Sequence, residues 1–132
     1  MLHSFLVATS TGLLRLTSEG TTFFNNLDKG GKDNFFNEIL RELSEVIPID
    51  IKRLSTSKRH QSDPRVIDQI QFPITIKSAN DTSERTVQQV INDLDTLVKN
   101  KGITPISFKR LTSYLDSTHG FQPTSNYESS IF

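Results

Sequence analysis

Residues 70–76 read Ile70-Gln71-Phe72-Pro73-Ile74-Thr75-Ile76, so large apolar residues alternate with other residues over the whole stretch. A period of two is typical of a β-strand with one buried face, because successive side chains of a strand point to opposite sides of a sheet. Pro73 has no backbone N–H to donate to a neighbouring strand, which favours an edge or a locally open position. The stretch therefore predicts a half-buried strand, and the flanking chain must cover its apolar face.

After this strand, the clearest helical pattern of the chain runs over about residues 82–101. Its apolar residues recur at spacings of three and four, which places them on one stripe of a helix. Asp81 and Glu84 have the spacing of a capping box at its start, and Gly102 is suited to end it. The stripe consists of Val87, Val90, Ile91, Leu94, Leu97 and Val98. We expect this helix to pack on a sheet.

Before the strand, residues 34–47 carry a second helical stripe, which ends at Pro48 because the residue before proline avoids helical conformation. Asp33 or Asn34 is the expected cap, and residues 29–32 are expected to form a loop. The glutamates off the stripe are expected to face water, and they are Glu38, Glu42 and Glu45. Residues 49–57 are expected to form another strand, whose inward residues are Ile49, Ile51 and Leu54.

The two ends of the chain complete the expected order of elements. Residues 2–9 alternate weakly and are expected to form the first strand, and residues 103–115 are expected to contain the last strand. The resulting order of strand, helix, strand, strand, helix and strand predicts an α+β fold of the ferredoxin-like, split βαβ type. Its sheet would be antiparallel with both helices on one face. We expect one domain over residues 1–116 and a polar C-terminal tail or linker over residues 117–132.

Composition excludes several classes of function. The chain has 132 residues, and its 15 basic and 15 acidic side chains cancel, which argues against a nucleic-acid binder. No apolar run approaches the length that spans a bilayer, so we expect a membrane connection only through a separate anchor. The absence of cysteine excludes disulfides and thiolate chemistry.

No catalytic, cofactor-binding or metal-binding motif is present, so we expect a protein that is not an enzyme and carries no cofactor. His3, His60 and His119 are scattered along the chain, and no nucleophile elbow surrounds Ser107 or Ser113. One local group of basic residues is expected to be a solvated strand face, with a small-anion site as the alternative. This group consists of Lys52, Arg53, Lys58, Arg59 and His60.

About half of the chain resembles the SEA-like modules of cell-surface proteins. The resemblance covers about residues 35–97. A helix that reads Phe-x3-Leu-x2-Leu from Phe36 leads into an Ile-Pro-Ile turn at residues 47–49 and a strand that opens with Ile51-Lys52-Arg53-Leu54. The alternating strand with Phe72 and the helix with Leu94 follow. The resemblance implies a ferredoxin-like fold and an extracellular or cell-surface location. Some SEA modules cleave themselves at a Gly-Ser bond between the middle strands, whereas residues 62–68 contain no such pair here.

These observations favour a non-enzymatic structural or interaction module of a cell-surface or secreted protein, acting as a spacer or a self-association domain. Asn80 begins an Asn-Asp-Thr glycosylation sequon, in agreement with that location. Phe121, Tyr127 and Phe132 punctuate the polar C-terminal stretch and are candidate contacts to a protein partner or a second copy. The alternative is an intracellular, cytoplasmic ferredoxin-like domain that binds a ligand or regulates.

Overall fold

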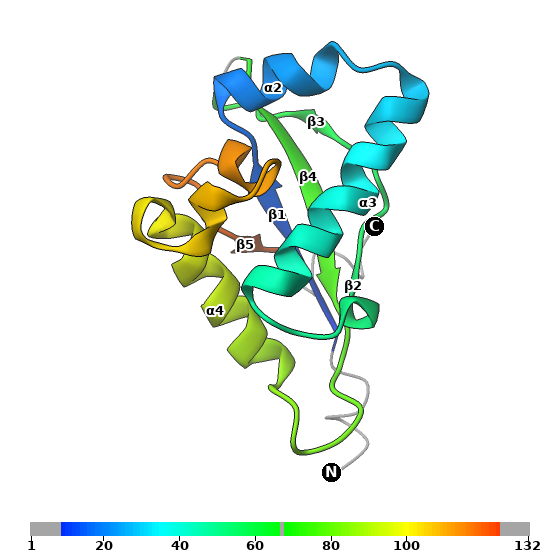
Figure 1. Ribbon diagram of the computed structural model, residues 1–132, viewed down its shortest axis with the longest axis vertical. Coiled ribbons are helices and arrows are strands. Elements are labelled where there is room, and N and C mark those ends of the chain that lie inside the picture. The colour runs from blue at the N-terminus through cyan, green and yellow to red at the C-terminus, as the bar shows by residue number, and fades with distance from the viewer. Residues whose placement is uncertain (1–8, 67, 125–132) are drawn as a thin grey trace.

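Five β-strands form one antiparallel sheet in this computed structural model, which describes residues 9–66 and 68–124. The strands are β1 (Ser10–Arg15), β2 (Leu54–Ser55), β3 (Gln61–Ser62), β4 (Ile70–Ile76) and β5 (Gln122–Pro123). Their order across the sheet is β2-β4-β1-β5, and β3 pairs with β4 beyond the end of β2 (Figure 1). The expected α+β class with an antiparallel sheet is therefore confirmed.

The strand with the alternating pattern lies in the interior of the sheet and not at its edge. Pro73 of β4 is opposite Leu13 of β1 on one side. On the other side its carbonyl oxygen accepts a hydrogen bond from Thr56 Oγ1 at 2.6 Å. The nitrogen and the carbonyl of one strand residue point to the same side, so the missing N–H of Pro73 faces the gap between β2 and β3. That gap tolerates proline in a central strand.

Helix α3 (Lys29–Val46) begins earlier than the sequence indicated. The Asp28 side chain accepts a hydrogen bond from Gly31 N at 2.7 Å, which caps the helix and places residues 29–32 in its first turn. Both the predicted cap at Asp33 or Asn34 and the predicted loop were wrong. A shorter helix, α2 (Ser18–Asn25), precedes α3 and was not predicted.

Helix α4 (Val87–Lys99) begins later than predicted. The Thr86 side chain accepts from Gln89 N at 3.1 Å, and the Gln89 side chain accepts from Thr86 N at 2.8 Å. This reciprocal capping box fixes the start of the helix, whereas the predicted pair of Asp81 and Glu84 lies in the preceding loop. The apolar stripe itself was predicted correctly, and Leu94 and Val98 are fully buried.

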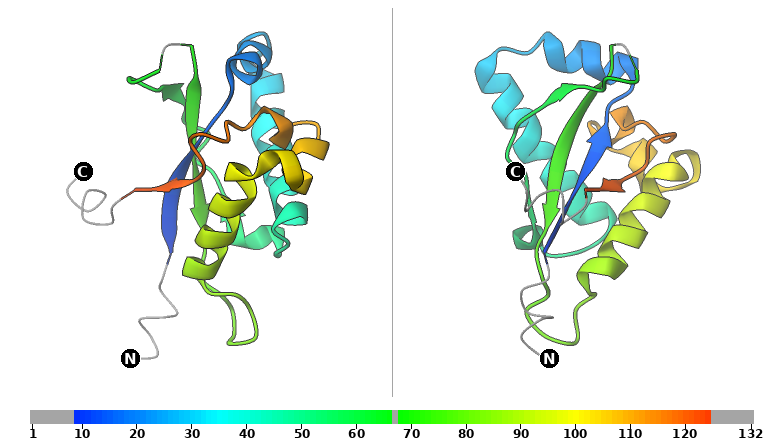
Figure 2. Two further views of the ribbon diagram at one scale, coloured as in Figure 1. Left: turned by 90° about the vertical axis from the view of Figure 1, so that its left-hand side faces the viewer. Right: turned by 180° about the vertical axis from the view of Figure 1, so that it is seen from behind.

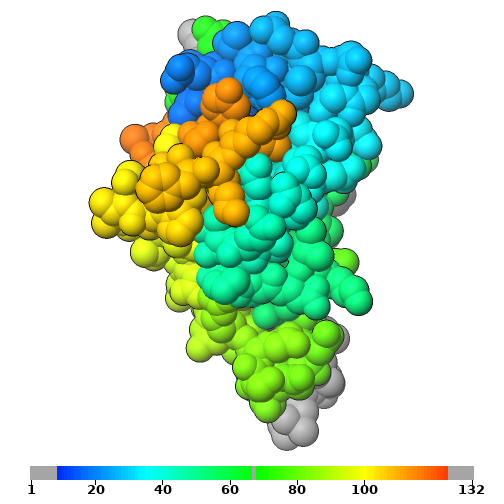
Figure 3. Space-filling view, in the orientation of Figure 1, coloured from blue at the N-terminus to red at the C-terminus, as the bar shows by residue number. Residues whose placement is uncertain are grey.

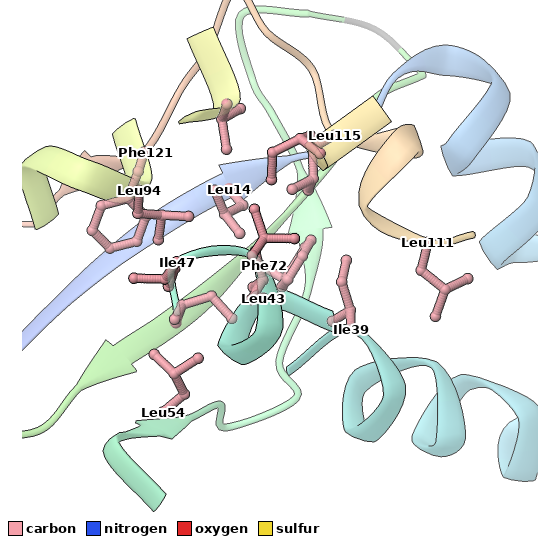
Figure 4. Close-up of a cluster of buried hydrophobic side chains, with 14 of the residues drawn as sticks. Leu14, Ile39, Leu43, Ile47, Leu54, Phe72, Leu94, Leu111, Leu115 and Phe121 are labelled. Atoms are coloured by element: carbon pink, nitrogen blue, oxygen red, sulfur yellow. The ribbon is translucent and has the colours of Figure 1, made fainter. Parts of the chain in front are cut away.

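The core lies between the sheet and the helices, which cover the same face of the sheet (Figure 2). Side chains from β1, β4, α3 and α4 meet there, as the cluster around Phe72 and Leu43 shows (Figure 4). Phe24 of α2 extends this cluster with an edge-to-face contact to Phe35, whose ring centroid lies 5.1 Å away. The apolar face predicted for residues 70–76 is therefore the floor of the core.

The predicted last strand within residues 103–115 is instead a series of short 3-10 helices. They are η2 (Lys101–Ile103), η3 (Pro105–Phe108) and η4 (Thr112–Tyr114), and they contact α2, α3 and α4 (Figure 3). The last strand of the described residues is β5, which pairs with Gly12 and Leu13 of β1. Residues 117–124 thus belong to the folded domain and not to a polar tail, because Phe121 fills a position in the core.

Two further predictions differ from the structure or fall outside it. Residues 49–57 contain one 3-10 turn, η1 (Ile51–Arg53), before the two-residue strand β2. Leu54 is buried as predicted, whereas Ile51 is 43% exposed because the turn rotates its side chain outward. The strand predicted over residues 2–9 lies outside the described residues, except for Thr9.

Candidate functional site

The candidate site residues named from the sequence lie in different environments. Asn80 is exposed in the loop between β4 and α4, where its side chain is accessible. Phe121 is only 2% exposed and packs in the core, so it is not a surface contact. Tyr127 and Phe132 lie outside the described residues. Phe121 was predicted to contact a partner, but it is a core residue of the domain.

The basic residues of segment 52–60 are split between two sides of the chain. Arg53 is 4% exposed, its Nε atom donates to Lys77 O at 3.1 Å, and its Nη1 atom lies 4.0 Å from Glu84. Lys58 turns toward α3 and pairs with Asp33 at 2.7 Å. A single solvated basic face, as predicted, is not formed, because Arg53 packs inward beneath the loop before α4.

A basic hollow lies between the first turn of α3 and residues 58–60. Its volume is about 630 Å³, and it is lined by Lys29, Gly30, Lys32, Asp33, Phe36, Lys58 and His60. The His60 ring packs edge-on against Phe24, with 4.8 Å between ring centroids, so its position at the rim is fixed. Asp33 already pairs with Lys58, so Lys29, Lys32 and the His60 imidazole are the groups of this hollow that are chemically suited to hold an oxyanion.

On the opposite face of the sheet, Arg15 clamps two acidic residues from distant parts of the chain. Its Nη1 atom lies 3.0 Å from Asp63, and its Nη2 atom lies 3.0 Å from Asp116. The clamp is almost entirely removed from water. Hydrogen bonds from the backbone and side chain of Arg65 hold the pKa of Asp63 well below its usual range, and the hydrogen bond from Arg15 adds to this against the opposing effect of burial.

Asp116 and His119 extend this polar group. Burial raises the pKa of Asp116, but hydrogen bonds from Thr118, Gln69 and Arg15 outweigh it, and the net pKa is lowered. His119 is 2% exposed, and burial lowers its pKa against the opposing effect of its contact with Gly120 O at 3.0 Å. The contacts of Arg15 and Asp116 join β1, the loop before β4 and the segment before β5.

Neither serine considered with His119 is arranged as a nucleophile. The Ser107 hydroxyl donates to Thr104 O at 3.2 Å, and the Ser113 hydroxyl donates to Arg110 O at 3.1 Å. A nucleophilic serine needs a base within hydrogen-bond reach of its hydroxyl. Both hydroxyl groups instead serve the local backbone of the 3-10 helices.

A smaller hollow of about 210 Å³ opens on the same face of the sheet as the Arg15 clamp. Gln71 of β4 lines it, is only 6% exposed, and has an Oε1 atom that is buried without a hydrogen-bond donor in the described part of the chain. Arg15 lies directly opposite Gln71, but the clamp occupies its guanidinium nitrogens. Gln71 Oε1 is therefore a buried acceptor without the donor that such groups usually have.

The most exposed large apolar side chains of the described residues lie on one loop. Ile103 is 86% exposed and Phe108 is 83% exposed, while Ile106 between them is fully buried. We call residues 103–108 the apolar loop. Thr112 Oγ1 donates to Ile106 O at 2.7 Å, and Thr104 Oγ1 donates to Leu97 O at 2.9 Å. The loop is thus fixed to the fold while its two apolar side chains project into solvent.

Glu42 of α3 fixes the chain that follows the apolar loop. It was predicted to face water, but it is 4% exposed. One of its carboxylate oxygens, Oε1, accepts hydrogen bonds from both Leu111 N and Thr112 N, each at 2.9 Å. A carboxylate aimed at two backbone N–H groups satisfies donors that the irregular chain leaves without partners. The prediction was wrong because the covering segment lies 69 residues later in the chain, where the local pattern of α3 gives no sign of it.

Sequence reasoning missed Gln71, Glu42 and Phe108 as functional or positioning residues. Gln71 and Glu42 sit at positions that their local periodicity assigns to the polar side, and only distant segments bury them. Phe108 belongs to residues that the sequence assigned to a strand. The sequence did contain evidence against that strand, because Gly102 and Pro105 lie among the apolar residues there and disfavour a continuous strand.

Comparisons with protein-family models, with curated proteins and with solved structures give no match to this chain. In the described ranges, no helix combines the length and the apolar character needed to cross a membrane. Residues 9–66 and 68–124 likewise contain no group of three or more His, Asp or Glu side chains placed to hold a metal ion.

Proposed function

We propose that the protein is a non-enzymatic interaction module that associates with a second copy of itself through the apolar loop. We further propose that its fold is ferredoxin-like. The strand order β2-β4-β1-β5 supports this when β2 and β3 are counted as one interrupted edge strand. Helices then follow the first and third strands, as in a split βαβ arrangement.

The exposure of Phe108 beside the buried Ile106 is the observation that carries this proposal. Complete burial of a phenylalanine side chain stabilises a protein or a complex by roughly 1.5–3 kcal/mol. Phe108 is mostly exposed in the monomer and gains little of this stabilisation there. Because hydrogen bonds of Thr112 and Thr104 already fix the loop, association would cost little additional ordering of the chain. An exposed aromatic side chain on a fixed loop is suited to be the central anchor of an interface.

Charges beside the apolar loop favour a second copy as the occupant. Lys109, next to Phe108, pairs with Glu45 of α3 at 2.8 Å, and Arg41 bridges Glu45 and Glu38. A two-fold axis through Phe108 would place these acidic and basic side chains against the same side chains of the second copy. Acidic groups of one copy can then face basic groups of the other. The net charge of zero also removes long-range repulsion between copies.

An extracellular or cell-surface location, as in SEA-like modules, is part of the proposal. The exposed Asn80 sequon supports it, and α4 separates Asn80 from the apolar loop by roughly 20 Å. A glycan at Asn80 would therefore leave the proposed interface free. Expression in a eukaryotic secretory host should give a glycosylated protein, and Asn80→Gln should remove the added mass. An unmodified wild-type chain would argue against this location.

Sedimentation velocity over a wide concentration range tests self-association. The wild-type chain should sediment faster as its concentration rises, and Phe108→Ser should remain monomeric. Ile51→Ser is the matched control, because Ile51 is also exposed but lies away from the apolar loop in η1. A wild-type chain that is monomeric at every concentration overturns self-association and leaves a different protein as the occupant. Association of the Phe108→Ser variant would exclude this loop as the interface.

A second candidate function, the binding of a small anion, is supported by the basic hollow. Lys29 and Lys32 enter it from α3, and Lys58 and His60 enter it from the segment after β2. Inorganic phosphate should then raise the melting temperature of the wild-type chain by mass action. Lys32→Gln should weaken that effect and Lys52→Gln, outside the hollow, should not. A melting temperature that phosphate does not change contradicts this function.

A further inference from the structure

We propose that the hollow beside Gln71 binds a small polyhydroxylated carboxylate, a ligand that carries both hydroxyl groups and one carboxylate. This site lies on the face of the sheet opposite the helices and is separate from the apolar loop. It goes beyond the proposed self-association and does not depend on it.

The side chain of Gln71 is buried, and its amide oxygen is without a donor in the described residues. A buried polar group without a partner destabilises a protein by about 1–3 kcal/mol. Rotation about the last side-chain torsion exchanges the amide oxygen and nitrogen, so either atom can face the hollow. A hydroxyl group can both donate and accept, and it can therefore satisfy the amide in either orientation.

The arrangement around Gln71 explains why the protein itself leaves this amide without a partner. Arg15 is directly across the ladder on β1, and its side chain is held by Asp63, Asp116 and Thr118. Gln61 is directly across on β3, and its side chain is exposed. The guanidinium of the cross-strand partner Arg15 is thus engaged, while the exposed side chain of Gln61 lines the same hollow.

Arg59 supplies the charge that selects a carboxylate. Its side chain lines the hollow, is exposed, and forms no ion pair with any described residue. Its planar guanidinium can bind a carboxylate through two parallel hydrogen bonds. Leu13 and Pro73, which face each other across β1 and β4, provide an apolar floor for the carbon skeleton of the ligand. The volume of about 210 Å³ limits the ligand to a small molecule.

Stability and binding should respond in opposite directions to Gln71→Met, a replacement of nearly the same shape. Because it removes an unsatisfied buried amide, the melting temperature should rise by a few degrees. The matched control is Gln69→Met, which should lower the melting temperature, since the Gln69 amide donates to Leu16 O and to Asp116. A fall in the melting temperature of Gln71→Met would show that the amide has a partner in the protein and would overturn the proposal.

Binding is measured by NMR titration of the isotope-labelled chain with gluconate, which carries hydroxyl groups and a carboxylate. The side-chain amide signals of Gln71 should shift, and both Gln71→Met and Arg59→Gln should weaken binding by about tenfold or more, while Lys52→Gln should not. Sorbitol, which lacks the carboxylate, and butyrate, which lacks hydroxyl groups, should each bind more weakly. The proposal fails if gluconate leaves the Gln71 signals unchanged, or if butyrate binds as well as gluconate.

Discussion

The aromatic ring of Phe121 lies directly against Gly12 of β1. A Cβ atom built at Gly12 would overlap Cζ, Cε1 and Cε2 of that ring. Phe121 is held in this place because its backbone N donates to Asp95 of α4 at 2.9 Å and because the next residue, Gln122, begins β5. The missing side chain of Gly12 thus allows the C-terminal segment to close the core beside Leu94 (Figure 4).

Gly12→Ala should lower the free energy of unfolding by roughly 1–3 kcal/mol, because the new methyl group must displace a buried ring. Gly102→Ala is the control, since a Cβ atom at Gly102 would meet no other atom within 4 Å and its φ lies outside the left-handed region. Chemical denaturation of both variants checks this difference. Equal stability of the two variants would mean that Phe121 does not occupy its position against β1 in solution.

The parts of the fold that local periodicity determines could be predicted from the sequence. The alternation over residues 70–76 and the stripe around Leu94 both identify residues that are buried in the structure. Each pattern works because one element alone decides which side of it faces the core. The α+β class follows from the number and kinds of these elements, even where their boundaries were wrong.

Boundaries were harder to predict because several nearby residues can cap a helix. Asp28, Asp33 and Asn34 are all good caps in isolation, and the structure uses Asp28. For α4, Thr86 with Gln89 replaces Asp81 with Glu84. The choice depends on where the helix must lie to place its apolar stripe on the sheet, and this is a tertiary effect that a local pattern does not contain.

Features that depend on long-range contacts were not predictable at all. Glu42 is buried by residues 111 and 112, and Phe121 is accepted into the core only because residue 12 is glycine. The hollow beside Gln71 likewise requires β1, β3 and β4 to meet. In each case the neighbouring sequence favours a polar surface or a tail, so the local pattern does not reveal that the residue is buried.

Removal of the buried carboxylate of Glu42 should destabilise the fold strongly. Glu42→Ala leaves Leu111 N and Thr112 N buried without an acceptor, at a cost of about 1–3 kcal/mol for each group. Glu42→Gln retains an acceptor oxygen and should cost less. Thermal and urea denaturation of the two variants measure the difference. Similar stabilities for both variants would contradict the assigned role of the Glu42 oxygen.

The loop between β3 and β4 should remain intact on long incubation. It contains no Gly-Ser pair, and Asp63 is held at its start by Arg15 and by hydrogen bonds from Arg65. Purified protein should therefore migrate as one band in denaturing electrophoresis after days at neutral pH. Two fragments whose boundary falls between Ser55 and Ile70 would show self-cleavage in spite of the missing pair.

Acidification should destabilise the protein in two steps. The pKa of buried His119 is lowered, so below about pH 6.5 the unfolded chain binds a proton more readily than the folded chain, and stability falls as the pH decreases through the folded-state pKa. The pKa values of Asp63 and Asp116 are also lowered. Their contribution is fully present above the unfolded-state pKa of about 3.9 and is lost as the pH falls through their folded-state values.

Melting temperatures from pH 8 to pH 2 should show both steps. His119→Gln should remove the upper step only, and Asp63→Asn should reduce the lower step only while lowering stability at pH 7. A wild-type melting temperature that is constant between pH 7.5 and pH 5 would exclude the role given to His119.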